Sequence, residues 1–543
     1  MVDLQRAPYG SAGFADARMR KRAGLMRHEG AYIGTDEAGR HHYSSHQSAI
    51  LVCGGARSLK GSVLIPWMID GYLNGAFGPM HIVSLDFKFQ NGRIAALQAR
   101  QGRHVVNITP REARSSRVDV LSYIDPASPE LIPLAKLFAA NWIPYSGGGN
   151  AAFFEGSAQR LLEGVIVVLA RKNNGVTLPD LADVMAGFGD ATDEWLDFEY
   201  DLSIAPEAEY RKIAQELSRL RDQGSESGGY SGIKNEIAKS FSVMSDPQWR
   251  RVLSPPFDFC PSQLTKDGAP PYLVTIAENK DYSETAAPVL RAIFTAFLVY
   301  KRRVPAAASR EQFWLLDEIG NVGKWPMAVE LATYGPGYGI RPAYIVQSTA
   351  QLDNLAPRAS TILPNSCGTQ IYTGTRSVEQ AALISRQLGR VTLNYVDPQN
   401  AERAQAARTK TLMRYGTGQV DAATVVGEMA EQERMAQQYR PMARDLRSLD
   451  EIINAPNGKA FVFLPGVLEK PAYLTIRPYW LRRDLAGAAM PDPFHAKDVN
   501  QIEVPTRFSM RTRRIVTERV PRNYAHLFQY QSGVWSYVQG YRP

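Results

Sequence analysis

The stretch Ala49-Ile50-Leu51-Val52-Cys53-Gly54-Gly55-Ala56-Arg57-Ser58-Leu59-Lys60-Gly61-Ser62 decides the fold. Its first five residues are an apolar run typical of a buried strand, and a helix-like segment follows from about Ser62 to Leu73. A strand that leads through a glycine-containing loop into a helix is the setting of a phosphate-binding loop, written G-x-x-x-x-G-K-[ST]. Gly54 and Lys60 stand at the separation that this motif requires.

Two positions depart from the motif. Leu59 stands where glycine is expected, and its Cβ would crowd the loop or alter its dihedral angles. Gly61 stands where Ser or Thr is expected, so Ser62 or Ser58 would have to supply the hydroxyl for Mg²⁺. Taken alone, the segment is equally compatible with a plain glycine turn. The residues that we predict to bind the nucleotide are Gly54, Gly55, Ala56, Arg57, Ser58, Leu59, Lys60, Gly61 and Ser62.

Two further strand ends carry groups that suit nucleotide chemistry. The apolar run Phe313 to Leu316 ends in Asp317 and Glu318, and the run Ala343 to Val346 ends in Gln347. In NTPases an Asp at this place holds Mg²⁺, a Glu orients the attacking water, and a neighbouring amide senses the nucleotide. A strand that runs into an acidic helix cap is the plainer interpretation of Asp317 and Glu318 alone. The three strand ends together favour binding of ATP with Mg²⁺. We expect Asp317 and Ser62 to hold the ion.

Short apolar runs alternate with helical segments over much of the chain. This order predicts an α/β fold with a doubly wound, mostly parallel sheet. Between the two halves of the sheet the chain is helical, so we expect an inserted all-α domain. The predicted division is a basic N-terminal segment (1–45), a nucleotide-binding domain in two parts (46–144 and 266–485), an all-α insertion (145–265) and a basic, aromatic tail (486–543). The runs are 49–53, 82–85, 105–108, 272–276, 313–316, 343–346, 369–372 and 460–464.

Composition excludes several classes of protein. The 543 residues include 62 Lys and Arg against 54 Asp and Glu, a net charge of +8 that permits an anionic partner. The sequence has no run of the ~18 to 20 apolar residues that a membrane span requires, and no secretory signal. Its three cysteines are scattered and have no metal-ligand spacing. We therefore expect a reduced, cytoplasmic protein.

Three segments carry weaker signals. His41, His42 and His46 are expected to be surface histidines in a loop rather than a metal site, because no cysteine or carboxylate pair completes a ligand set. Ala401 to Arg440 is polar and suggests a flexible excursion. The tail fits nucleic acid, an anionic membrane, a partner protein or a solvated segment on a neighbouring subunit. Its arginines are Arg507, Arg511, Arg513, Arg514, Arg519 and Arg522, and its aromatic residues are Tyr524, Phe528, Tyr530, Trp535, Tyr537 and Tyr541.

The motifs resemble, in order, those of a known family. The matching blocks are Tyr9 to Asp16, the phosphate-binding loop, Leu85-Asp86-Phe87-Lys88, Phe153-Phe154, Leu315 to Lys324, Tyr338 to Arg341, Val346-Gln347-Ser348, Ile384-Ser385 with Leu388-Gly389, and Leu449 to Ile452. Together they resemble the TraG/TraD/VirD coupling proteins, which are ring ATPases of conjugation and type IV secretion. The likeness covers most of residues 8 to 485.

This resemblance implies a RecA-like nucleotide-binding domain, a helical domain that faces the secretion apparatus, and a central pore. Carried over by position, Lys60 contacts phosphate, Asp317 coordinates Mg²⁺, Glu318 activates water and Gln347 senses the nucleotide. The partners that the resemblance implies are further copies in a ring of six, single-stranded DNA bound to a relaxase or secreted effectors, and inner-membrane components. No arginine finger can be placed: Arg341 and Arg376 are candidates, but a structural or solvated role is the better expectation for each.

The resemblance predicts an ATP-driven motor that recruits and translocates its substrate to a secretion channel. Leu59 and Gly61 favour one alternative, a receptor or adaptor that binds nucleotide without efficient hydrolysis. The other alternative is a DNA motor of the FtsK/HerA group. Most family members carry membrane-spanning helices just before the region that matches Tyr9. We therefore expect a member without an anchor, or one with a separate anchor subunit, that is peripheral at the inner membrane through its partners.

Overall fold

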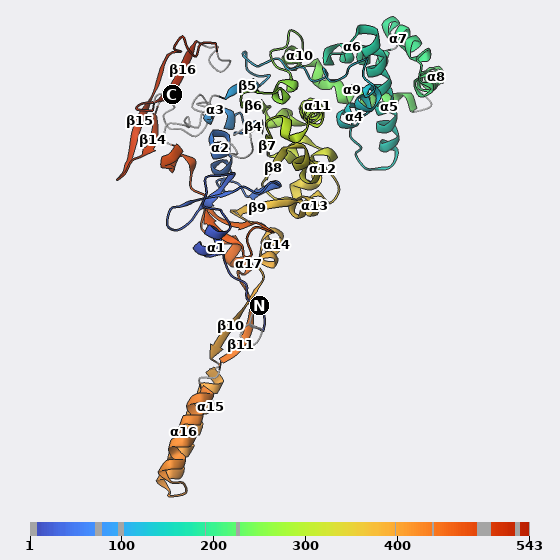
Figure 1. Ribbon diagram of the computed structural model, residues 1–543. Coiled ribbons are helices and arrows are strands. Elements are labelled where there is room, and N and C mark those ends of the chain that lie inside the picture. Colours follow the sequence, from blue (N-terminus) through green and yellow to red (C-terminus); the bar gives the residue numbers. More distant parts are fainter. Residues whose placement is uncertain are drawn as a thin grey trace.

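A computed structural model of the chain shows a large central sheet with helices on both faces (Figure 1). It describes residues 8–70, 79–95, 103–190, 192–223, 229–396, 398–436, 439–485, 501–526 and 533–541. Leu73, the predicted end of the first helix, and the tail residues Phe528 and Tyr530 lie outside these ranges. None of the described helices combines the length and the apolar character that a membrane crossing requires.

The central sheet has eleven described strands in the order β2-β1-β13-β12-β9-β3-β8-β7-β4-β6-β5. The seven strands from β9 to β5 are parallel, and the remaining four extend the sheet by antiparallel pairing. The bounds are β1 (Ala31–Thr35), β2 (His41–Ser44), β3 (Ala49–Gly54), β4 (His81–Asp86), β5 (His104–Ile108), β6 (Tyr272–Ala277), β7 (Gln312–Asp317), β8 (Ile340–Val346), β9 (Cys367–Thr373), β12 (Lys459–Phe463) and β13 (Ala472–Thr475). The predicted α/β fold with a mostly parallel sheet is confirmed.

The parallel strands are mostly apolar and almost entirely buried because helices cover the sheet on both faces. Ile50 and Val52 pack with α2 (Gly61–Asp70) and α3 (Asn91–Ile94) in one core. Leu51 and Cys53 point to the opposite face and a second core. Its helices are α4 (Leu131–Trp142), α11 (Ser283–Arg302), α12 (Pro326–Tyr334), α13 (Ala359–Ser366), α14 (Val378–Leu388) and α17 (Leu449–Ile453).

Between β5 and β6 the chain forms a separate group of helices beside the second core (Figure 1). These are α5 (Gly149–Asn173), α6 (Leu178–Asp190), α7 (Asp193–Ser203), α8 (Ala208–Asp222), α9 (Gly229–Phe241) and α10 (Pro247–Val252). They occupy the interval in which the sequence predicts an all-α insertion. The exact domain boundaries stay a prediction.

The expectation of a loop with surface histidines in the N-terminal segment is wrong. The segment 1–45 is not a loop throughout: besides α1 (Ala17–Arg22) it holds β1 and β2, and His42 is a buried residue of β2. Arg20 donates a hydrogen bond to its ring at 3.1 Å, so His42 is a core residue rather than a surface histidine.

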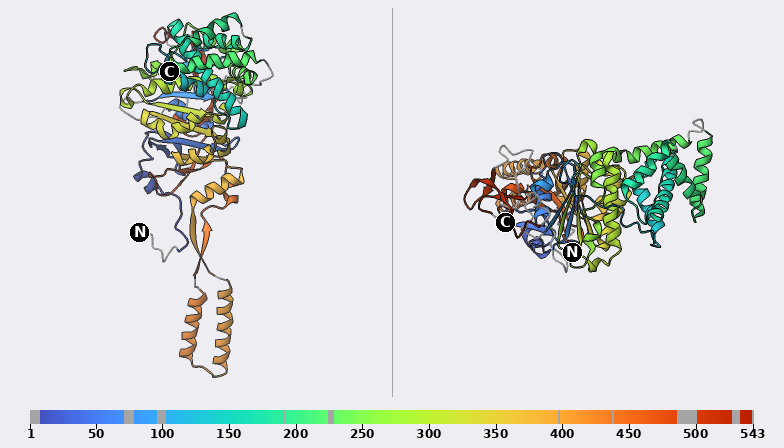
Figure 2. Two further views of the ribbon diagram at one scale, coloured as in Figure 1. Left: turned by 90° about the vertical axis from the view of Figure 1, so that its right-hand side faces the viewer. Right: turned by 90° about the horizontal axis from the view of Figure 1, so that it is seen from above.

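The segment from 401 to 440 is not an irregular excursion. It forms a stalk in which the paired strands β10 (Arg390–Val396) and β11 (Tyr439–Asp445) carry the helices α15 (Pro398–Gly416) and α16 (Ala422–Ala436) away from the body (Figures 1 and 2). The two helices contact each other, and Thr411 donates a hydrogen bond to Glu428 at 2.7 Å between them. The segment is polar because each helix has only the other to pack against, not because it lacks structure.

The tail folds as a small sheet of its own. Strands β14 (Gln501–Pro505), β15 (Met510–Arg519) and β16 (Val534–Val538) pair antiparallel with β15 in the centre. In the view from above, this sheet and the α5–α9 group lie on opposite sides of the central sheet (Figure 2).

Candidate nucleotide-binding site

Four neighbouring parallel strands end together at one edge of the central sheet. β3, β8, β7 and β4 follow one another in the sheet, so their carboxyl ends bring together residues distant in sequence. β3 leads into the loop 54–62, β8 into Gln347, and β7 ends at Asp317 followed by Glu318. β4 ends at Asp86. The crevice at the carboxyl ends of such strands is where α/β sheets bind ligands.

The loop can approach a ligand closely because its first residues are glycines. A Cβ on Gly54 would lie 2.5 Å from Ser58 Oγ and 2.6 Å from the carbonyl oxygen of Thr373. A Cβ on Gly55 would lie 2.7 Å from the carbonyl oxygen of Gly374. All three distances are shorter than van der Waals contact, so a side chain at Gly54 or Gly55 would displace the loop from the end of β9.

Leu59 takes the backbone conformation that the motif reserves for glycine. Its φ is +65°, in the left-handed region. The half-buried side chain packs against the core on the α2 face, and its Cδ1 lies 3.2 Å from where a Cβ on Gly458 would be. Leu59 therefore keeps the left-handed turn at a cost of about 1–2 kcal/mol. The crowding that the sequence suggested is avoided because Gly458 makes room for the side chain.

Lys60 lies close to the carboxylates of β7. Burial lowers the pKa of its ammonium group, and the negative charges of Asp317 and Glu318 oppose that effect. The structure thus brings together the three charged groups that the sequence predicts to act on nucleotide.

Asp317 belongs to a buried pair of carboxyl groups. Its pKa is raised to about 6, first by burial and then by the charge of Asp86. Asn91 bridges the pair: its backbone N–H donates to Asp86 at 2.8 Å, and its side-chain amide donates to Asp317 at 3.1 Å. Two like charges held in a buried site are a ready position for a cation.

Glu318 is held by two partners. Lys88 forms an ion pair with its Oε1 at 2.7 Å, and the amide of Gln347 donates to the same oxygen at 3.1 Å. Burial raises the pKa of Glu318, but the hydrogen bond and charge of Lys88 outweigh it, so the net pKa is lowered. Glu318 also has a φ of +49°, a strained conformation of the kind found at functional sites.

Asp86, Lys88 and Asn91 were not predicted as site residues. The signal was present, because Leu85-Asp86-Phe87-Lys88 is one of the motifs that carry the resemblance. What the sequence alone does not show is that β4 lies directly beside β7, which places Lys88 against Glu318.

The two hydroxyls proposed for Mg²⁺ lie in different surroundings. Ser62 Oγ is buried and accepts a hydrogen bond from the backbone N–H of Tyr479 at 3.3 Å. Ser58 Oγ is buried and has no hydrogen-bond partner among the described residues. In the described part of the chain no three His, Cys, Asp or Glu side chains form a metal cluster. Mg²⁺ does not need one, since it binds through one or two carboxylates plus water and phosphate oxygens.

The two candidate arginines differ in position. Arg341 lies near the start of β8, at the opposite end of the strand from Gln347, where it is buried and paired with Glu311 at 3.1 Å. It is a structural arginine, as expected. Arg376 is exposed and lies beside the loop, with its Cδ 3.7 Å from the position of a Cβ on Gly55.

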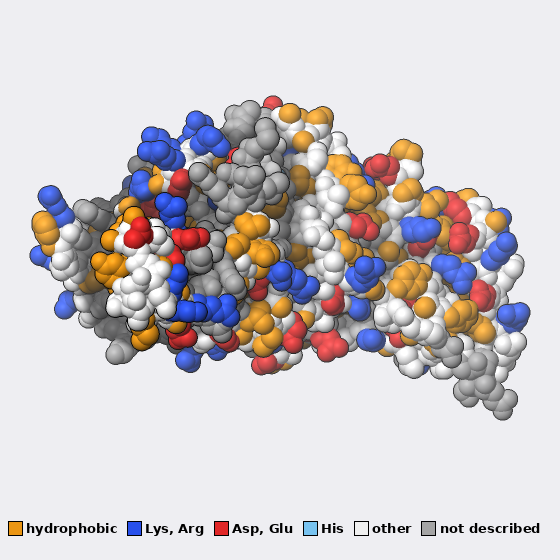
Figure 3. All heavy atoms as spheres, turned by 90° about the horizontal axis from the view of Figure 1, so that it is seen from below, with side chains coloured by type: hydrophobic (Ala, Val, Ile, Leu, Met, Phe, Trp, Pro, Cys, Tyr) orange, Lys and Arg blue, Asp and Glu red, His pale blue; other side chains and the backbone are white. Residues whose placement is uncertain are grey.

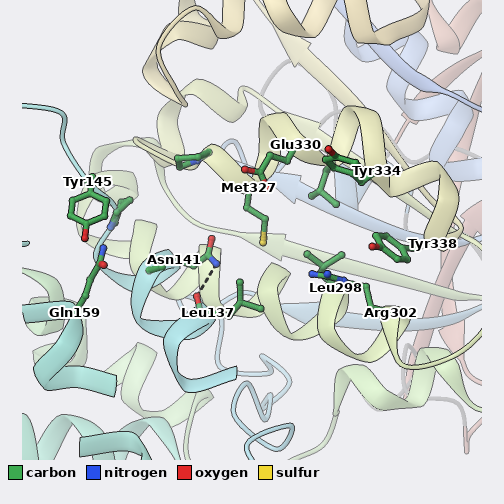
Figure 4. Close-up of a pocket in the computed structure, with 14 residues that line it drawn as sticks. Leu137, Asn141, Tyr145, Gln159, Leu298, Arg302, Met327, Glu330, Tyr334 and Tyr338 are labelled. Atoms are coloured by element: carbon green, nitrogen blue, oxygen red, sulfur yellow. Dashed lines mark hydrogen bonds between the residues drawn. The ribbon is translucent and has the colours of Figure 1, made fainter. Parts of the chain in front are cut away.

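A separate cavity of about 500 Å³ lies between α4, α5, α11 and α12 (Figure 4). Its wall is mainly apolar and aromatic, with Glu330 and with Arg302, whose guanidinium lies 5.1 Å from the ring centre of Tyr338. None of the residues of the loop or of the carboxylate cluster lines it. The residues that the sequence predicts to bind nucleotide therefore lie apart from this cavity.

The fold and this site define a phosphate-binding-loop protein of the RecA-like type. Residues 13–414 match the family described as "Type IV secretory system Conjugative DNA transfer", and the chain belongs to this family. Protein VirD4 of Rhizobium rhizogenes is 24% identical over 272 residues, which are 47% of this chain. The match spans only 37% of the length of that relative.

Solved structures show the same fold. The unbound bacterial conjugative coupling protein TrwBdeltaN70 superposes with a TM-score of 0.59 at 16% identity, over 88% of this chain and 97% of the other. The plasmid coupling protein TrwB in complex with ADP and Mg²⁺ superposes with a TM-score of 0.57 at 15% identity, over 86% of this chain and 96% of the other. The expected RecA-like fold and the resemblance to coupling proteins are confirmed.

Proposed function

We propose that this chain is the ATPase that couples a transferred substrate to a type IV secretion channel. The observation that carries the proposal is the convergence of Lys60, Asp317, Glu318 and Gln347 at the ends of three adjacent strands. Family membership and the nucleotide complexes of TrwB support it. The substrate would be single-stranded DNA bound to a relaxase, or effector proteins.

The residues present fit ATP and Mg²⁺. Gly54 and Gly55 let the loop 54–62 lie close against the end of β9, and Lys60 supplies a cation for phosphate oxygens. Asp317, with Asp86 behind it, would hold Mg²⁺, which neutralises charge on the phosphates when it is bound. Ser58 Oγ, which has no described partner, suits this ion better than Ser62 Oγ, which the backbone of Tyr479 already engages.

Glu318 would hold the attacking water and accept its proton. Lys88 keeps this carboxylate ionised, which a base requires, and Gln347 fixes its orientation. Both partners contact the same oxygen, Oε1. Oε2 is 3.5 Å from the amide of Asn321, a long contact that would leave this oxygen to the water.

One observation favours the alternative of a receptor that binds nucleotide with little turnover. Glu318 is tied to Lys88 at 2.7 Å, so it must exchange or share this partner before it can act as a base. Gly61 in place of the usual hydroxyl residue points the same way. Membership of the conjugative transfer family favours either reading over a motor of the FtsK/HerA type.

We propose that the protein works as a ring of six copies at inner-membrane components of the channel. It would be cytoplasmic and peripheral, held at the membrane by those partners or by a separate anchor subunit. The α5–α10 group would be the all-α domain that faces the apparatus.

ATP hydrolysis by the purified chain, with and without single-stranded DNA, tests the proposal. We expect Lys60→Ala to abolish nucleotide binding, and Glu318→Gln to bind nucleotide with kcat lowered about 10²-fold or more. Lys212→Ala is the matched control, because Lys212 is exposed on α8 on the far side of the second core. If wild type binds ATP without turnover and Glu318→Gln leaves transfer in cells unchanged, the receptor is the correct function.

A further inference from the structure

The β14–β16 sheet carries an unusual concentration of charge that the nucleotide site does not use. Between Val504 and Asn523 the chain has six arginines and one acidic residue, Glu518. In the described part of the chain none of these arginines forms an ion pair with a carboxylate, whereas arginines of the body such as Arg111 and Arg341 are paired. Glu518 accepts a hydrogen bond from the Trp535 indole at 3.1 Å. The arginines are Arg507, Arg511, Arg513, Arg514, Arg519 and Arg522, and all but the half-buried Arg513 are exposed.

The arginines form a line rather than a round patch. Four of them lie on β15, the central strand, and Arg507 lies in the turn before it. Arg511 and Arg513 are two residues apart on one face of this strand, so their Cα atoms are about 7 Å apart. Such spacing along an extended strand suits successive phosphates of a linear polyanion. A membrane surface would instead be matched by a broad, flat group of cations.

The turn between β14 and β15 presents an aromatic ring to solvent. Phe508 is 88% exposed, which makes it the most exposed of the large hydrophobic side chains described. The turn is closed by hydrogen bonds from Thr506 N–H to the Ser509 carbonyl at 2.7 Å and from Ser509 N–H to Thr506 Oγ1 at 3.2 Å. The Arg507 guanidinium lies 5.2 Å from the ring centre. Seen from below, this turn is the left-hand end of the molecule, where hydrophobic side chains adjoin Lys or Arg (Figure 3).

We propose that the β14–β16 sheet binds single-stranded nucleic acid. Arg511, Arg513 and Arg519, which share one face of β15, contact phosphates along the strand, and Phe508 stacks on a base at the turn, with Arg507 beside it. Cationic side chains with an aromatic platform are how proteins bind single strands without sequence preference. A duplex keeps its bases stacked on each other, so the ring of Phe508 selects for a single strand. The inference rests on the proposed function for one point only, that the transferred strand is the ligand.

Fluorescence anisotropy with a labelled single-stranded DNA of mixed sequence tests the phosphate contacts, using the full chain without nucleotide over a range of salt concentrations. Arg511→Gln, Arg513→Gln and Arg519→Gln combined, three residues on the same face of β15, should lower the slope of log K against log salt by about 2, at roughly 0.7 per phosphate contact. The matched control replaces Lys212, Arg219 and Lys239 by Gln. These three exposed cations lie on α8 and α9, and none of them belongs to a described ion pair. Their loss should leave the salt slope unchanged.

Phe508→Ala tests the stacking contact separately. It should weaken binding of the single strand about 5- to 150-fold with an unchanged salt slope, and leave binding of duplex DNA unchanged. The side chain is exposed, so the variant should fold, and a thermal melt that matches wild type would verify this.

Three outcomes would overturn the proposal. The triple variant and its control could bind DNA with the same salt slope, or Phe508→Ala could bind the single strand as wild type does. In the third outcome the triple variant loses binding to phosphatidylserine vesicles but keeps binding to DNA. The last result would assign the sheet to a membrane surface. The test is separable from the proposed function. Lys60→Ala should bind DNA normally, and basal ATP hydrolysis of the triple variant should equal wild type.

Discussion

At the scale of single residues, Leu59 shows that a motif position is defined by its backbone conformation. The residue differs from the glycine of the motif, but its φ of +65° is the one that glycine would supply. We therefore expect Leu59→Gly to change kcat for ATP by less than about twofold. The free energy of unfolding should change by about 1 kcal/mol or less, because relief of the left-handed strain offsets the lost packing against the core. Steady-state ATPase assays and urea denaturation measure both. A tenfold gain in kcat would show instead that Leu59 obstructs the site.

Lys88 controls the protonation of Glu318. Its ion pair at 2.7 Å lowers the pKa of Glu318, and a base with a lowered pKa stays ionised to lower pH. Lys88→Met removes the cation, so the pKa of Glu318 should rise. The acidic limb of the pH profile of kcat should then move upward by about one pH unit or more.

Lys324→Met is the control for this experiment, because Lys324 donates only to the carbonyl oxygen of Asp353, at 3.4 Å. It should leave the profile in place. If the pH profile of kcat for Lys88→Met matched that of wild type, the ionisation of Glu318 would not be the one that limits kcat at low pH.

The sequence predicted the site residues that follow recognisable strands, and missed those that act through pairing. Lys60, Asp317, Glu318 and Gln347 each follow an apolar run, so their positions could be inferred one strand at a time. The bridge from Asn91 to Asp317 depends on β4 lying beside β7. Strand order is a tertiary property, and local apolar patterns do not encode it.

At the scale of elements, the same limit separates the strands that were predicted from those that were not. β3, β7 and β8 are buried throughout and mostly apolar because both faces are covered, so even short apolar runs stand out. β1 and β2 pair at the antiparallel end of the sheet and contain Gly34, His41 and His42, which interrupt any apolar run. Their burial depends on contacts with β13 and α2, which lie far away in sequence or across a loop.

The α15–α16 pair behaves as an independent element. Val396 and Tyr439, the last and first residues of β10 and β11, are directly paired. A two-residue Asn-Gly turn can therefore replace residues 397–438 without separating the strands. We expect this deletion to change the melting temperature by less than about 3 °C and kcat by less than about twofold, since the helices pack on each other and not on the sheet. Calorimetry and ATPase assays would check this. A large loss of stability would show that the hairpin supports the body.

At the scale of the whole molecule, the proposed nucleotide site lies at one edge of the sheet, where the chain itself supplies two cations. Lys60 and Lys88 act on Asp317 and Glu318, while Arg341 lies at the other end of β8 and Arg376 lies beside Gly55. Phosphoryl transfer commonly draws a further cation from a neighbouring subunit. A ring would supply such a cation. The β14–β16 sheet and the α5–α10 group lie on opposite sides of the central sheet, so in a ring they would contact different partners.

Mixing experiments test whether a site depends on ATP hydrolysis in the neighbouring subunit. Wild-type chain is combined with rising fractions of Glu318→Gln, whose substituted side chain is close in size, at a fixed total concentration and with single-stranded DNA present. If each site needs an active neighbour, activity should fall as the square of the wild-type fraction, to about a quarter in an equal mixture. Independent sites would give a straight line, with half of the activity remaining. The same assay with Lys212→Ala as the added chain should show no loss, because that subunit keeps its own site intact. A linear decrease with Glu318→Gln would show that each site turns over without a neighbour that hydrolyses ATP.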